Sequence, residues 1–127
     1  MRTFNLGLEH HQQSVLIEWC ELNRQKYPAL DSIFAVPNGD LRIKSVAARL
    51  TSEGVKPGVP DLFLSFPSNG FHGCYIEMKR LVGGRLSKEQ IIWRDRLTAN
   101  GYKVVVAAGW EVAKDAIIEY LTPKTEL

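Results

Sequence analysis

The chain has 127 residues, of which 45% are hydrophobic, and its formal net charge is +2. This length supports one ordinary core and leaves little room for a second, so we expect a single domain over residues 1–127. Cys20 and Cys74 form no Cys-x-x-Cys pair and lie at no zinc-ligand spacing from a histidine, which argues against a zinc site and predicts reduced core thiols. The first residues lead into no long apolar run, so we expect a soluble cytoplasmic protein with neither signal peptide nor membrane span.

The first half of the chain alternates helix and strand signals. Apolar residues at helical spacing predict a helix from about residue 8 to residue 26, with Pro28 as a stop signal. A short buried strand is expected over residues 33–36, ended by the turn-forming run Pro37-Asn38-Gly39-Asp40. A second helix is expected over residues 43–52.

The second half begins with two strands, over residues 60–64 and 74–79, whose Gly-, Pro-, Ser- and Asn-rich connection favours an antiparallel hairpin. A helix from Ser87 to Asn100, a buried strand over residues 103–107 and a helix over residues 110–121 should follow. The order α-β-α-β-β-α-β-α predicts an α/β fold, with a mixed central β-sheet flanked by helices. On the second and fourth helices, the residues expected to face inward are Val46, Ala47, Leu50, Val112, Ala116, Ile117 and Tyr120.

The hairpin carries two acids and one base at its open end. Reflecting the chain about Gly70 places Asp61 opposite the stretch Glu77-Met78-Lys79. Glu77 and Lys79 are two residues apart on one strand, so their side chains point to the same face. This layout is typical of metal-dependent nucleases.

Pro60-Asp61 and Glu77-Met78-Lys79 resemble the signature of the PD-(D/E)XK nuclease superfamily, and the closer resemblance is to its VRR-NUC family. The matching residues are Glu9-His10 with Gln13, Pro37-Asn38-Gly39, Gly54 to Leu62, Ile76 to Lys79, Ser87 with Gln90, and Gly101-Tyr102. The resemblance implies a restriction-endonuclease-like core and a small phage or bacterial protein, working in the cytoplasm of a bacterial or phage-infected cell. It also implies cleavage of branched DNA, including Holliday junctions, by a homodimer with Mg²⁺ or Mn²⁺.

The three motif side chains suit phosphodiester hydrolysis. The reaction needs a nucleophile made from water and relief of charge on the phosphate, and a divalent cation supplies both. Because Mg²⁺ prefers oxygen ligands and keeps several waters, we expect it on Asp61, Glu77 and the backbone carbonyl of Met78. Lys79 should add positive charge near the attacking water or the phosphate. The alternative, solvated charges at strand ends, is disfavoured by the full pattern.

Gln90 and Glu9 each have two interpretations. Gln90 stands three residues after Ser87, as in a capping box, but also lies on an inward helix face where it can position a water or Lys79. Glu9 is a favourable acid in a first helical turn, or, by resemblance to archaeal junction resolvases, a candidate metal ligand. Gln12 falls within the apolar stripe of that helix and therefore needs a hydrogen-bond partner.

Basic residues cluster around the motif, as a DNA-binding surface requires. The candidate DNA contacts are Lys56, Arg80, Arg85 and Lys88. Solvating charges on loops and helices are the alternative. Two other functions also remain open, a nuclease that trims flaps or ends and a DNA-binding module with a degraded site, although the intact acids and lysine argue against degradation.

Overall fold

The structure is a computed structural model and describes residues 8–37 and 44–124. Its elements are α1 (Glu9–Leu22), η2 (Pro28–Ser32), β1 (Ile33–Ala35), α2 (Lys44–Ser52), β2 (Leu62–Leu64), β3 (Cys74–Lys79), α3 (Lys88–Ala99), β4 (Lys103–Ala108) and α4 (Trp110–Leu121). The predicted order of helices and strands is confirmed, with the short 3-10 helix η2 as an addition. The first helix ends at Leu22 rather than near residue 26. Asn38 and most of the expected turn at residues 37–40 lie outside the described residues.

The four strands form one mixed sheet in the order β1-β2-β3-β4, in which only the β3–β4 pair is parallel. The predicted antiparallel hairpin is confirmed, with Leu62 opposite Ile76 and Leu64 opposite Cys74. Asn69 and Gly70 turn the chain with positive φ angles of 49° and 86°, a conformation that glycine and asparagine tolerate best.

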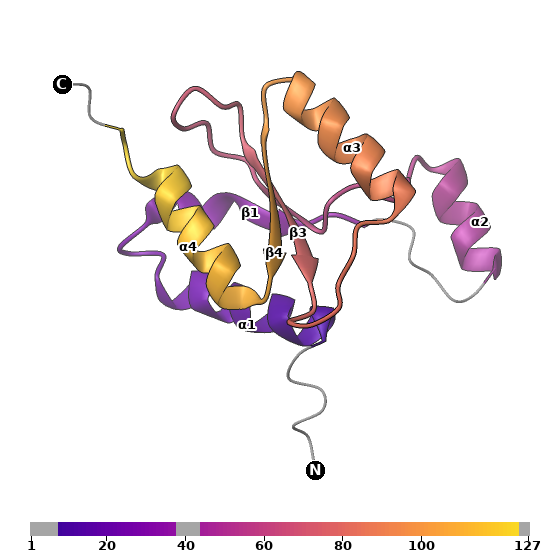
Figure 1. Ribbon diagram of the computed structural model, residues 1–127, viewed down its shortest axis with the longest axis horizontal. Coiled ribbons are helices and arrows are strands. Elements are labelled where there is room, and N and C mark those ends of the chain that lie inside the picture. The colour runs from indigo at the N-terminus through magenta and orange to yellow at the C-terminus, as the bar shows by residue number, and fades with distance from the viewer. Residues whose placement is uncertain (1–7, 38–43, 125–127) are drawn as a thin grey trace, which may run out of the picture.

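Helices cover the two faces of the sheet unequally (Figure 1). On one face, α1 and α4 pack together against β3 and β4, and α3 lies on the other side. The core fills the α1–α4 side; its fully buried members are Leu16, Cys20, Leu62, Leu64, Cys74, Ile76, Met78, Ala107, Ala113 and Ile117. Alternate residues of β2 and β3 therefore face this core, and the residues between them face α3.

The strands expected at residues 33–36 and 103–107 are present as β1 and β4, but the prediction that they are buried is wrong. Both are edge strands of the sheet. Phe34 of β1 is 51% exposed, and Ala107 is the one buried residue of β4. Apolar runs predict burial on both faces, but an edge strand with a half-covered face buries much less.

Two helix faces also differ from expectation. Val112 is exposed, and its neighbour Ala113 faces the core instead. Helix α2 buries no residue, so Val46, Ala47 and Leu50 are only half-buried. Figure 1 shows the reason, because α2 stands away from the sheet at the end of a connection rather than on either face.

Candidate active site

The site lies at the end of β3, on the face that looks toward α3. Strand alternation sends Ile76 and Met78 into the core, which leaves Glu77 and Lys79 on the opposite face. Both charged side chains are nonetheless buried, with exposed fractions of 2% and 7%. Buried charges are rare unless they have partners.

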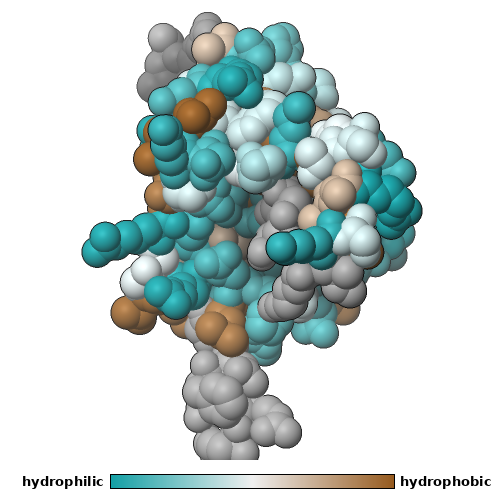
Figure 2. Space-filling view, turned by 90° about the vertical axis from the view of Figure 1, so that its right-hand side faces the viewer, coloured by the Kyte–Doolittle hydropathy of each residue, from teal (hydrophilic) through white to brown (hydrophobic). Residues whose placement is uncertain are grey.

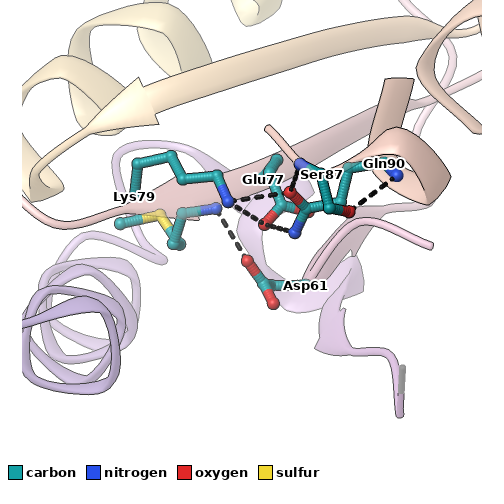
Figure 3. Close-up of polar contacts among 6 residues, drawn as sticks. Asp61, Glu77, Lys79, Ser87 and Gln90 are labelled. Atoms are coloured by element: carbon teal, nitrogen blue, oxygen red, sulfur yellow. Dashed lines mark hydrogen bonds and ion pairs between the residues drawn. The ribbon is translucent and has the colours of Figure 1, made fainter. Parts of the chain in front are cut away.

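Asp61 sits just before β2 and joins three strands. Its backbone carbonyl accepts the N–H of Val36 at 2.8 Å, which extends the β1–β2 ladder by one residue. Its side-chain Oδ2 accepts the N–H of Met78 on β3, also at 2.8 Å. The carboxylate is thereby held beside the Glu77-Met78-Lys79 stretch, and the structure brings the three predicted motif residues together (Figure 3).

Gln90 connects α3 to both charged residues of β3. Its Oε1 accepts Lys79 Nζ at 2.8 Å, and its Nε2 donates to Glu77 Oε2 at 3.0 Å. The same Oε1 accepts the N–H of Ser87 at 2.8 Å, while Ser87 Oγ accepts the N–H of Gln90 at 3.1 Å, which completes a capping box. The two interpretations of Gln90 therefore describe one arrangement, because the side-chain oxygen serves the cap and the lysine together (Figure 3).

The Glu77 carboxylate is incompletely satisfied. Lys79 Nζ lies 3.7 Å from Glu77 Oε2, and within the described part of the chain Glu77 Oε1 is buried with no hydrogen-bond partner. Burial, and then the negative charge of Asp61, raise the pKa of Glu77 to about 8, although Lys79 pulls it the other way. Two adjacent carboxylates with an unpartnered oxygen fit a hard divalent cation, because its charge would offset theirs and its preferred ligands are oxygens.

Glu9, the first residue of α1, is exposed at this end of the sheet. Its negative charge also raises the pKa of Glu77, so it lies within electrostatic reach of the site. Across residues 8–37 and 44–124, no three His, Cys, Asp or Glu side chains are grouped closely enough to hold a metal ion. The structure therefore does not group Glu9 with Asp61 and Glu77, and its role as a ligand stays a prediction.

Gln12 has the partner that its inward position required. It is 5% exposed, and its Oε1 accepts the N–H of Trp110 at 2.9 Å, at the start of α4. Because the N-cap residue Gly109 offers no side chain, Gln12 takes over that role from α1. The N–H of Gly109 in turn donates to the carbonyl of Lys79 at 3.1 Å, which ties the start of α4 to the end of β3.

The four candidate DNA contacts, Lys56, Arg80, Arg85 and Lys88, are all exposed. Lys56 lines an open groove of about 380 Å³ beside α3, together with Pro57, Glu89, Ile92, Trp93 and Arg96. The Arg96 guanidinium lies 4.6 Å from the centre of the Trp93 ring. The chain approaches α3 closely at Gly58, since a Cβ there would come within 2.6 Å of the Glu89 backbone.

Sequence reasoning missed two features of the site. The bond from Gln12 to the start of α4 spans 98 positions in sequence, and only the polarity of Gln12 within an apolar stripe pointed to it. The groove residues Trp93 and Arg96 stand three apart on α3, which is the spacing at which helical side chains meet. That spacing was the available signal for their ring contact.

Comparisons with known proteins agree with the geometry. The model of the VRR-NUC domain family matches residues 8–111, which include all the motif residues described above. A solved structure described as a VRR_NUC domain protein is 30% identical, with a TM-score of 0.76 over 91% of this chain and 90% of that chain. None of the curated proteins matches this chain. Within the described residues, no helix is long and apolar enough to cross a membrane. The fold, the motif and the family model lead to one conclusion: the chain belongs to the VRR-NUC domain family, a nuclease-type domain that acts on DNA.

Proposed function

We propose that this chain is a metal-dependent, structure-selective endonuclease that hydrolyses phosphodiester bonds in branched DNA, in the manner of a Holliday-junction resolvase. One observation carries the proposal. Glu77 is buried beside Asp61, one of its oxygens has no hydrogen-bond partner among residues 8–37 and 44–124, and Lys79 is held next to it by Gln90. A purely structural buried ion pair would satisfy its oxygens within the protein.

Asp61, Glu77 and the backbone carbonyl of Met78 would hold Mg²⁺ or Mn²⁺, with Glu9 as a further candidate ligand. The bound cation supplies a water-derived nucleophile and offsets charge on the phosphate. Hydrogen bonds already hold both carboxylates in position. The Met78 N–H fixes the Asp61 side chain to β3, and Gln90 fixes the Oε2 atom of Glu77, which leaves the Glu77 Oε1 atom available for a cation.

Lys79 is the positive group that the protein itself contributes. Its ammonium accepts no hydrogen bond, and its two described contacts are Gln90 Oε1 at 2.8 Å and Glu77 Oε2 at 3.7 Å. Since its side chain is nearly buried, its charge is poorly screened by water. An ammonium held in this way stabilises the negative charge that develops on the phosphate in the transition state.

The expected substrate is DNA, bound through phosphate contacts from the exposed Lys56, Arg80, Arg85 and Lys88. A four-way junction is two-fold symmetric, and one chain carries one such site. A homodimer would therefore supply two symmetric cuts.

Cleavage of end-labelled four-way junction, flap and linear duplex, with Mg²⁺, Mn²⁺, Ca²⁺ or chelator, tests this function. We expect junction cleavage with Mg²⁺ or Mn²⁺, little with Ca²⁺ and none in chelator. Asp61→Asn should be inactive, while Lys124→Ala, which changes an exposed lysine beyond the C-terminal end of α4, serves as the control. Preferential cutting of flaps would favour the trimming nuclease, binding with no cleavage would favour a degraded site, and full turnover in chelator would refute the mechanism.

A further inference from the structure

The connection from β3 to α3 carries two exposed apolar residues directly after the site. Leu81 is 52% exposed and Val82 is 84% exposed, and we refer to this pair as the loop tip. A partner that covers these two side chains would gain free energy, because burying apolar surface is favourable. In Figure 1 the connection turns at the lower edge of the molecule, at the end of the sheet where α1 begins.

The loop tip is held close to Lys79. The side chain of Leu81 lies against Gly109, where any Cβ would collide with it. Arg80 Nη2 donates to the carbonyl of Gly83 at 3.2 Å, which closes the turn. A Cβ on Gly84 would lie 3.0 Å from the Lys79 Cβ, so the returning chain passes directly over the lysine. These contacts give the tip a defined position relative to the reacting end of β3.

The surroundings of the tip match nucleic acid. Arg80 and Arg85 are exposed on either side of it, and Figure 2 shows a mostly hydrophilic face with hydrophobic residues near its left and lower margins. Guanidinium groups pair with phosphates, and aliphatic side chains can insert between bases that have lost their stacking partners. A linear duplex covers its base faces, whereas a branch point exposes them.

We propose that the Leu81–Val82 tip inserts at the branch point of the DNA substrate and sets the distance from the branch to the cut. The inference rests on the proposed function and adds how the branch is sensed. A second copy of the chain is a weaker occupant, because two small side chains cover far less than the ~800 Å² per partner of a standard interface. Arginines meeting around a two-fold axis would also repel each other.

Val82→Ser tests the proposal, with Leu22→Ser as a matched control, because Leu22 is 79% exposed at the other end of α1. Serine cannot fill the apolar space that Val82 would occupy between unstacked bases, so we expect Val82→Ser to lower junction cleavage roughly tenfold. Cleavage of linear duplex should fall by less than about twofold, and the cut positions around the branch should spread. Leu22→Ser should match the wild type in all three.

A second readout needs no cleavage. In chelator, 2-aminopurine placed at the branch should brighten when the wild-type protein unstacks it, and Val82→Ser should weaken this response. If the wild type cuts nothing, this signal still supports or overturns the tip while the proposed function fails. An unchanged junction preference in Val82→Ser or an equal loss in Leu22→Ser would overturn the tip alone. A wild type that cuts junction and duplex equally would overturn both the tip and the structure selectivity of the proposed function. Conversion of a dimer to a monomer by Val82→Ser, seen by light scattering, would assign the tip to subunit contact.

Discussion

The two faces of β3 use the same backbone for opposite purposes. Cys74, Ile76 and Met78 point into a core in which each is fully buried and touches apolar neighbours. Glu77 and Lys79 point the other way and are almost as buried, yet their neighbours are charges and an amide. Apolar burial stabilises the fold, whereas burial of adjacent carboxylates costs free energy that a bound cation would offset. The core-face residues therefore stabilise the strand, whereas the strand positions the site-face residues Glu77 and Lys79.

Removing charge from the site face should give the largest effect. Lys79→Ala should lower cleavage by about 10²–10³-fold, the usual loss when one group that stabilises transition-state charge is removed. Asp61→Asn and Glu77→Gln should likewise abolish most cleavage. Junction binding, measured by gel shift, should largely remain, because the proposed phosphate contacts are other residues. Full activity in any of the three variants would remove that residue from the site.

Truncation on the core face should act on stability instead. Met78→Ala should lower the free energy of unfolding by ~2–5 kcal/mol, because it leaves a cavity between β3 and the helices α1 and α4. Met78→Leu, which nearly conserves volume, should cost less than ~1.5 kcal/mol. Urea unfolding measures both. Equal stability of the alanine variant and the wild type would mean that this face is not the main core.

Gln90 contributes both to stability, through the helix cap, and to the site, through Lys79 and Glu77. A substitution of Ser87 can separate the two roles. Gln90→Ala should cost about 1 kcal/mol of stability from the lost cap and should also slow turnover by freeing Lys79 and Glu77. Ser87→Ala removes the hydroxyl that accepts the Gln90 N–H but leaves the Gln90 side chain in the site, so only stability should fall. Thermal melting and single-turnover rates on the two variants decide the matter. Normal turnover in Gln90→Ala would reduce Gln90 to its capping role.

The smallest effect is a pH dependence of the metal-free protein. The pKa of Glu77 is raised from 4.5 to about 8, so between these values the folded state binds a proton that the unfolded state has released. Stability should therefore fall as pH rises through this window. Melting temperatures at pH 5 and pH 8, compared between the wild type and Glu77→Gln, isolate this group, and the variant should show the shallower slope. An identical slope in both proteins would contradict the raised pKa.

The sequence predicted the site better than its surroundings. Asp61, Glu77 and Lys79 could be placed together because strand alternation and a single turn determine their positions, and both are local properties. The structure shows Gln90 in contact with the Ser87 cap and with Lys79 and Glu77 at once, because an amide side chain has an acceptor end and a donor end.

The features that the sequence did not predict all depend on tertiary context. Nothing local distinguishes an apolar edge strand such as β4 from a central one, and nothing local shows that α2 stands away from the sheet. The bond between Gln12 and Trp110 joins opposite ends of the chain, where a single sequence offers no pairing signal.

The two cysteines of the chain are free and completely buried. Burial raises the pKa of the Cys20 thiol to about 11 and that of the Cys74 thiol to about 12, so almost no thiolate exists at neutral pH. A maleimide or Ellman-type reagent should therefore label the protein only when α1 or the β2–β3 hairpin opens. The two native thiols thus report local opening, and the core-face and site-face variants can be compared by their labelling rates without an engineered cysteine.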